Sequence, residues 1–191
     1  MTTLAELQED VFSLTNHPEL VVETALAIRT ATFKLHLLEF WEEDRVETSI
    51  SVTQTDGLYQ IDVSAEISPL CRHIEYVQKL ADYKFLTKIH PTDVFDDYGN
   101  MKNNVFYRVG SKLNCRSDTA DIAVLVGYLK APVTSGSGYS SWIADLYQHI
   151  IAIEAASIVF NGIGETDLSK KLQVMQAENL ALLKINHLPQ G

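Results

Sequence analysis

Apolar residues recur every three or four positions in three long segments of the chain, and between the first two segments they alternate with polar residues. The helical spacing predicts long helices over about residues 18–41, 141–161 and 165–187. A shorter helix is predicted from about Leu4 to Ser13, because Thr3 and Glu6 have the spacing of a capping box. The alternating spacing predicts strands over about residues 45–130.

The order of these elements predicts an α+β fold. Helices at both ends of the chain would form an antiparallel bundle, made of residues 1–44 and 131–191. The region over about residues 45–130 would be an inserted, antiparallel, β-rich domain.

Two hairpins are predicted within the β-rich region. Asp56-Gly57 separates VETSISVTQT from LYQIDVSA, and Asp-Gly between alternating segments is the strongest short-range hairpin signal. A second hairpin is predicted around Gly110-Ser111, between VFYRVG and LNCRS. Further strands are predicted over Arg72–Leu80, Tyr83–His90 and Ala120–Lys130.

The long helices carry more apolar surface than one core contact requires. The helix over residues 141–161 has one broad apolar arc, and the other two have two apolar stripes each. A helix with two stripes is expected to be covered on two sides. In the helix over residues 18–41, the first stripe is Val22, Leu26, Phe33, Leu37 and Phe40, and the second is Val21, Ile28 and Leu35. In the last helix, Leu168, Leu172, Met175, Leu182 and Leu183 form one stripe, and Val174, Ala181, Ile185 and Leu188 form the other. The second stripes are the candidate protein interface, and self-association into a ring is its simplest use.

Charge and composition exclude several classes of function. The chain has 191 residues and a net charge of −10, and its 15 basic residues are scattered. A protein that grips DNA by its phosphates needs clustered cations, so a DNA-binding grip is not expected. An acidic surface favours solubility, and it also suits a conduit through which DNA slides without sticking.

The expected compartment is intracellular. The N-terminus has no signal-peptide pattern, and no apolar run approaches the length of about 18 to 20 residues that a membrane span needs. A role at a membrane is therefore not expected. The spacing of Cys71 and Cys115 indicates neither a metal cluster nor a disulfide framework, and it leaves a single disulfide open.

The sequence predicts no catalytic, cofactor or metal site. No two of the six histidines have i, i+4 spacing, and Gly136-Ser137-Gly138 lacks the context of a phosphate-binding loop. The acidic loop Asp93–Asn100 could hold calcium through oxygen ligands, but turn chemistry explains its composition better. Ser140-Ser141 before Trp142 is best explained as a helix cap.

Two polar residues fall within apolar stripes of the helices. His36 is expected to be a hydrogen-bonded core or interface residue. Glu154 lies within the apolar arc of the helix over residues 141–161, and a buried carboxylate needs a partner. Arg29 also lies within an apolar stripe of its helix, which makes it a candidate ion-pair partner.

Several segments together resemble one known family. GYLKAP spans Gly127–Pro132, SWIADLY spans Ser141–Tyr147, and a glycine, Gly164, precedes the last helix. YRVGSKL stands upstream at Tyr107–Leu113. This arrangement resembles the head–tail connector (adaptor) proteins of tailed bacteriophages, in which a β-rich insertion interrupts a helical bundle.

The resemblance implies a structural role in the virion at the head–tail junction, for a protein made in the host cytoplasm. Such adaptors form a twelve-subunit ring under the portal protein, extend the DNA channel used in genome ejection, and offer a platform for a downstream tail or neck protein. The family has no catalytic residues. Leu183 to Gly191, which includes His187 and Leu188, would be the portal-facing end.

Two alternatives remain open at this stage. One is another neck or tail-completion protein of a phage. The other is a small-molecule-binding α+β domain, with a pocket framed by the loops Pro91–Asn104 and Pro132–Ser140.

Overall fold

The computed structural model describes residues 1–191 except 53–57, 96–98, 119–121, 135–137 and 188–191. Helices and strands are both abundant, which confirms the α+β class. The chain divides into two compact units, one formed by residues 1–44 with 131–191 and the other by residues 45–130. They are called the helical unit and the β unit.

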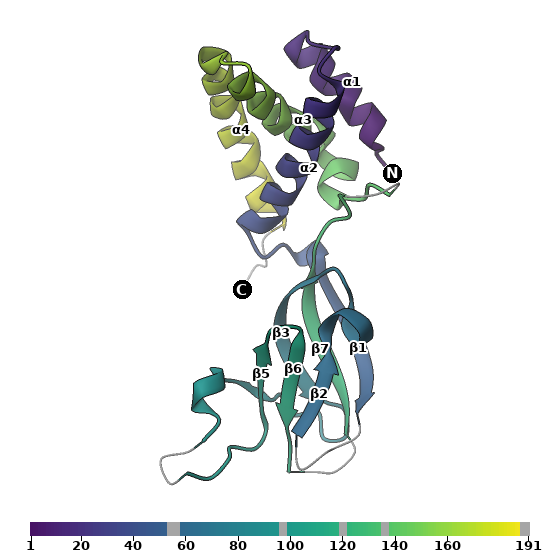
Figure 1. Ribbon diagram of the computed structural model, residues 1–191, viewed down its shortest axis with the longest axis vertical. Helices are drawn as coiled ribbons and strands as arrows, with labels where there is room; N and C mark the ends of the chain where they lie inside the picture. Colours follow the sequence, from purple (N-terminus) through teal and green to yellow (C-terminus); the bar gives the residue numbers. More distant parts are fainter. Residues whose placement is uncertain (53–57, 96–98, 119–121, 135–137, 188–191) are drawn as a thin grey trace. The chain divides into compact units, whose positions relative to one another are not determined.

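The central element of the helical unit is α3 (Trp142–Gly162), which contacts each of the other three long helices (Figure 1). These are α1 (Leu4–Thr15), α2 (Val21–Leu38) and α4 (Thr166–His187). Their ends lie within a few residues of the predicted ends. The short 3-10 helix η1 (Glu42–Asp44) completes the unit before the chain enters the β unit.

Helix caps appear where the sequence predicts them. The Glu6 carboxylate accepts a hydrogen bond from the Thr3 backbone N–H at 2.7 Å, and Thr3 Oγ1 accepts from Glu6 N–H at 3.2 Å. Ser141 Oγ accepts from Ala144 N–H at 3.2 Å at the start of α3. Each bond satisfies a backbone or side-chain donor that the helix itself leaves unpaired.

α3 is buried on most of its circumference. Ala152, Ala155 and Ala156 lie in the same core cluster as Ala27 and Ala31 of α2, and such small residues let two helices approach closely. By length and composition, α3 could also cross a membrane, although most of its apolar stretch is buried inside the helical unit. The sequence-based expectation that no segment reaches the length of a span was therefore too strict.

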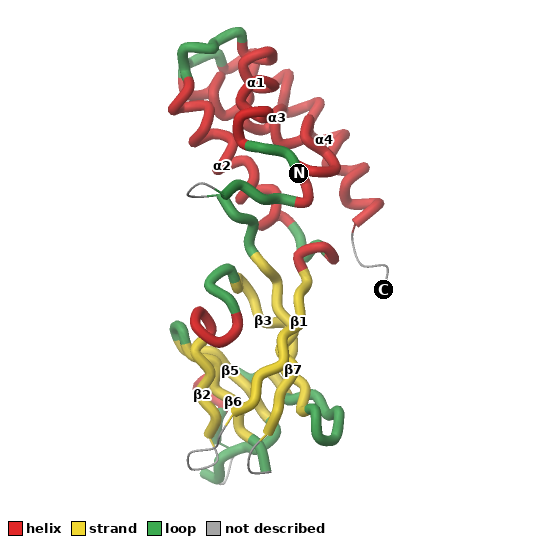
Figure 2. The backbone as a smooth tube through the Cα atoms, turned by 90° about the vertical axis from the view of Figure 1, so that its right-hand side faces the viewer, coloured by secondary structure: helices red, strands yellow, loops and turns green. Residues whose placement is uncertain are grey.

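The β unit contains two sheets (Figure 2). In the first, β7 (Ile122–Lys130) pairs antiparallel with β1 (Arg45–Val52) on one side and β3 (Cys71–Lys79) on the other. The second has the order β2 (Leu58–Asp62), β6 (Lys112–Arg116), β5 (Val105–Val109), β4 (Thr87–Lys88). One apolar cluster draws residues from both sheets, among them Tyr59, Ile61, Leu113, Val124 and Val126.

The first predicted hairpin is wrong, and the second is confirmed. β1 pairs with β7 and β2 pairs with β6, so the strands flanking Asp56-Gly57 lie in different sheets. Asp56 and Gly57 themselves lie outside the described residues. Alternation shows which side chains face the core, but it does not select the partner strand. β5 and β6 do form an antiparallel hairpin, with Gly110 at a positive φ of 58°.

Within the strand predicted over Tyr83–His90, the structure forms the two-residue strand β4, which pairs parallel with β5. Tyr83 adopts a left-handed backbone with φ 56°, so the strand does not begin at this residue. Among the described strands of the β unit, every pairing except β4 with β5 is antiparallel.

In the first sheet, an aromatic side chain of one strand passes over its neighbour at a glycine. Gly127 of β7 is level with Tyr76 of β3 and with Glu47 of β1. The Tyr76 ring lies over Gly127, so that a Cβ there would stand 2.4 Å from two ring carbons. The Tyr76 hydroxyl donates a hydrogen bond to Glu47, and this bond raises the pKa of Tyr76 to about 12.

Candidate functional site

α2 exposes several large apolar side chains on the side away from the core. Val22 and Leu26 are 76% and 63% exposed, and Phe33 and Leu37 are also exposed. Their spacing places all four on one side of the helix. This set is called the α2 face. The buried side holds two large apolar residues, Ile28 and Leu35, beside smaller or polar ones, namely Thr24, Ala27, Ala31, Thr32 and His36. An open hollow along the exposed side is lined by Arg29, Thr30, Phe33, Lys34, Leu37 and Leu38.

α4 likewise exposes large apolar side chains. Val174 and Ile185 are 67% and 69% exposed, and Met175 and Leu182 are exposed beside them. These four residues are called the α4 face. The buried residues of α4 are Ser169, Gln176 and Leu183. They recur every seven positions, which makes a narrow contact line on the opposite side of the helix.

The line between α4 and α3 is largely polar. Ser169 Oγ lies 2.8 Å from Ser157 Oγ and donates to the Ser157 carbonyl at 3.1 Å. Gln176 Nε2 donates to the Ile150 carbonyl at 3.2 Å. A helix normally covers its apolar side and exposes its polar side. Here hydrogen bonds, together with Leu183 and the partly buried Leu172 and Leu180, hold α4 against the core, while the residues of the α4 face point outward.

The candidate interface residues divide accordingly. Val21, Val174, Ala181 and Ile185 are exposed, and His187 is partly buried. Leu188 lies outside the described residues.

Ile28, Leu35 and Leu183 correct the prediction, because all three are buried in the core of the helical unit. They are not available to a partner in this fold. The apolar pattern predicts the stripes of α2 but not which of them packs inward. On α4 it fails further, because Met175 and Leu182 are exposed although the pattern groups them with the buried Leu183. The alanines of α3 favour a neighbouring helix with small residues. Ala27 and Ala31 are such residues, and they lie on the same side of α2 as Ile28. That pattern of small residues was the signal in the sequence.

A buried polar cluster connects the end of α2 to the start of α3. His36 Nδ1 lies 2.8 Å from Asp44 Oδ1, and His36 Nε2 lies 2.9 Å from Ser141 Oγ. Trp142 Nε1 donates to Asp44 Oδ1 at 2.9 Å. The expectation that His36 is a hydrogen-bonded core residue is confirmed.

The order serine, histidine, aspartate is that of a hydrolytic triad, but burial argues against catalysis. Ser141, His36 and Asp44 are only 4%, 2% and 3% exposed, and Ser141 Oγ already caps α3. A nucleophile must reach a substrate carbonyl, and this hydroxyl is enclosed. The cluster instead joins α2 and the end of the first segment of the helical unit to the start of α3.

The C-terminal end of α4 is held by a second cluster. His187 Nε2 lies 2.7 Å from the Tyr147 hydroxyl, and His187 Nδ1 bonds to Glu43. The His187 ring lies against Trp142, with the ring centroids 4.9 Å apart. One turn earlier, Lys184 forms an ion pair with Glu39. His187 therefore positions the end of α4.

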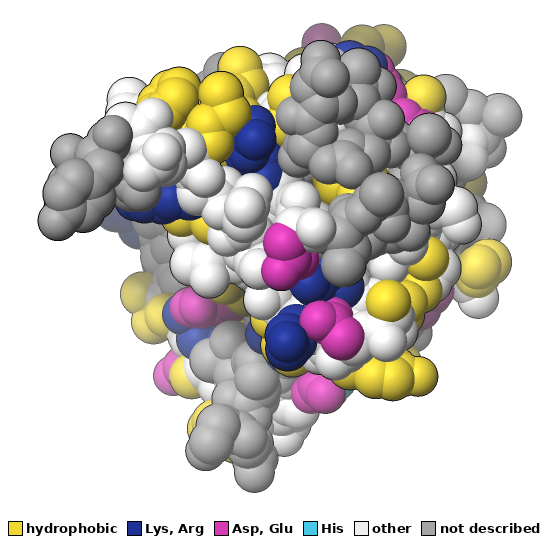
Figure 3. Space-filling model, turned by 90° about the horizontal axis from the view of Figure 1, so that it is seen from below, with side chains coloured by type: hydrophobic (Ala, Val, Ile, Leu, Met, Phe, Trp, Pro, Cys, Tyr) yellow, Lys and Arg dark blue, Asp and Glu magenta, His cyan; other side chains and the backbone are white. Residues whose placement is uncertain are grey.

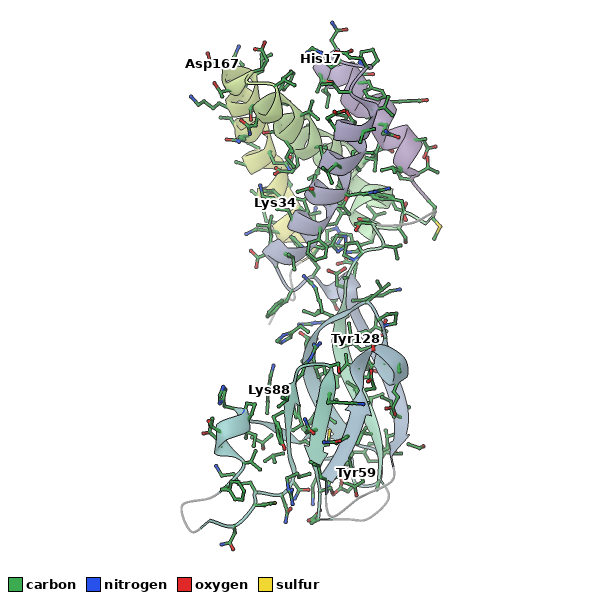
Figure 4. All side chains as sticks on the ribbon, viewed as in Figure 1. His17, Lys34, Tyr59, Lys88, Tyr128 and Asp167 are labelled. Atoms are coloured by element: carbon green, nitrogen blue, oxygen red, sulfur yellow. The ribbon has the colours of Figure 1, made fainter. Side chains whose placement is uncertain are left out.

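Glu154 is buried and paired, but not with the candidate partner. Lys34 Nζ lies 2.5 Å from Glu154 Oε1, and Lys34 extends from α2 (Figure 4). Arg29 was the candidate partner. Its Nε is instead buried with no hydrogen-bond partner among the residues that the structure describes.

Within the described residues, no group of three or more His, Cys, Asp or Glu side chains could hold a metal ion. Asp96 and Asp97 of the acidic loop lie outside that part of the chain. Both cysteines are free thiols, so the disulfide left open is not formed. Burial raises the pKa of Cys115 to about 12, which makes this thiol unreactive at neutral pH.

Acidic and basic side chains lie side by side on the face drawn in Figure 3, and basic ones do not gather into a patch there. A comparison of the sequence with models of known families and with characterised proteins finds no match. The α2 face and the α4 face are therefore the features of the molecule that bear on its function.

Proposed function

We propose that this protein is a structural subunit that assembles with copies of itself, as a head–tail connector of a tailed bacteriophage. The observation that carries the proposal is the exposure of large apolar side chains on one side of α2 and on one side of α4. Large exposed apolar faces mark protein contacts, because a monomer gains nothing from leaving them in water. The helical unit would be an antiparallel bundle, and residues 45–130 its β-rich insertion.

Two different faces on one chain favour a ring. When one surface contacts a different surface of the next copy, the assembly closes into a ring if the rotation between copies allows it. The α2 face and the α4 face lie on separate helices and differ in sequence, as such a contact requires.

The charge of the chain supports a channel. A net charge of −10 would repel the phosphates of DNA, so DNA could pass through the ring without being held. The portal protein would bind one side of the ring, near the C-terminal end of α4, and a downstream tail or neck protein the other. The protein would act in the virion and perform no catalysis.

Native mass spectrometry, with and without the portal protein of the same phage, tests the proposal. We expect a ring, or a complex with portal that contains many copies. Assembly can depend on the portal as a template, so the decisive sample is the mixture. A chain that stays monomeric beside portal at tens of micromolar would contradict the proposal. A complex with tail protein alone would indicate a tail-completion role instead.

A further inference from the structure

We infer that copies of this chain contact one another by packing the α2 face of one copy against the α4 face of the next, with Arg29 beside Glu178. The inference rests on the proposed function only in assuming that copies associate. It specifies which surfaces meet, in which direction and in which register.

The two faces carry charges of opposite sign: a half-buried arginine lies at the edge of the α2 face, and an exposed glutamate lies among the residues of the α4 face. Arg29 lies between Leu26 and Phe33 on α2, and its buried Nε has no partner among the described residues. Glu178 is exposed on α4, one turn after Val174 and one turn before Leu182. Packing like faces together would set Arg29 against Arg29 or Glu178 against Glu178, and like charges at a contact are unfavourable. Packing unlike faces pairs them.

The apolar residues fit the same register. Leu26 precedes Arg29 by three residues, and Met175 precedes Glu178 by three. Phe33 and Leu182 each follow the charge by four. With Arg29 level with Glu178, Leu26 therefore lies level with Met175 and Phe33 with Leu182, as in a helix–helix contact with apolar side chains on both sides of one ion pair.

The direction also fits a rotation between copies. α2 and α4 both begin at the end of the helical unit marked by His17 and Asp167 and run the same way (Figures 1 and 4). A rotation about an axis along the helices keeps that direction, so α4 of the next copy would run parallel to α2.

Disulfide trapping of mixed variants tests the contact, in a Cys71→Ser background. We expect Leu26→Cys mixed with Met175→Cys to yield a cross-linked dimer under mild oxidation, and each variant alone to yield little. Cross-linking of Leu26→Cys alone would overturn the inference in favour of an α2–α2 contact. No cross-linking in any sample, including at high protein concentration, would also overturn it.

Charge reversal supplies an independent measurement. Arg29→Glu or Glu178→Arg alone should weaken self-association by about tenfold or more, and the double variant should recover most of it, because close charge pairs at interfaces are coupled. Glu9→Arg on α1 makes the same charge change away from both faces and should have little effect. Single variants that assemble like the wild type would refute the pairing.

The two proposals can fail separately. If the wild type assembles with portal but neither cross-links nor responds to charge reversal, the α2–α4 contact is wrong and the connector function stands. If the cross-link forms but portal is never bound, the contact stands and the connector function is wrong.

Discussion

Single residues show where the β unit tolerates no change. At Gly127 the ring of Tyr76 occupies the space that any other side chain would need, on its way to Glu47 one strand further on. The sequence presents this glycine inside an apolar strand, where a close approach of another group is a general expectation. It could not identify Tyr76 as that group, because the β3–β7 pairing joins strands far apart in the chain.

Gly127→Ala should lower the free energy of unfolding of the β unit by about 1–3 kcal/mol, because the added methyl group overpacks the site. Urea unfolding measures this change. Gly162→Ala at the end of α3 is the matched control, since a Cβ there meets nothing within 4 Å, and it should be neutral or slightly stabilising. Adding Tyr76→Ala should remove the clash. Equal stability of Gly127→Ala and wild type would show that the ring does not lie over this position.

Asp62 should titrate far below an ordinary carboxyl. The Ser64 hydroxyl, Lys112 and the Ala65 N–H all hydrogen-bond to it and lower its pKa from 3.8 to about 2. Because the pKa is lowered on folding, the resulting stability is complete above pH 3.8 and is lost as the pH falls toward 2. The stability difference between wild type and Asp62→Asn should therefore shrink over that window. Carbon-13 NMR of the carboxyl gives the midpoint directly, and a value near 3.8 would contradict the hydrogen-bonded arrangement.

Elements were predictable to the extent that local signals define them. Capping residues and apolar spacing located the four long helices, and Gly110 located one hairpin. The partner of β1 was not predictable, because alternation fits a neighbour in either sheet. The inward side of α2 was also missed. The side of α2 that packs inward is determined by residue size and not by hydrophobicity alone, because Ala27 and Ala31 share a core cluster with the alanines of α3.

Trp142 connects the start of α3 to α2, η1 and α4. Its indole packs against Trp41, His36 and His187 and donates to Asp44. Trp142→Ala should destabilise the helical unit by about 3–5 kcal/mol in denaturant melts, as the loss of a large packed ring does. Trp142→Phe keeps an aromatic ring and removes the donor, so it should cost less. A loss below about 1 kcal/mol for the alanine variant would mean that the ring contributes little to the core.

For the whole molecule, folding and assembly should depend on different sides of the same helix. Leu183 is buried against α3, whereas Ile185, two residues later, is 69% exposed on the α4 face. Leu183→Ala should cost the helical unit about 2–5 kcal/mol, because it leaves a cavity. Ile185→Lys should change the stability of the monomer by about 0.5 kcal/mol or less, because its side chain is already in water.

Assembly should show the reverse dependence. Ile185→Lys places a charge in the α4 face, and a buried charge without a partner opposes association. We expect this variant to remain a folded monomer where the wild type associates, with unchanged circular dichroism and unfolding midpoint but a lower mass by light scattering. An Ile185→Lys chain that assembles like the wild type would exclude the α4 face from the contact. Because Ile185 is not part of the core, that result could not be attributed to misfolding. The variants at Leu183 and Ile185 together distinguish a core residue from an interface residue on the same helix.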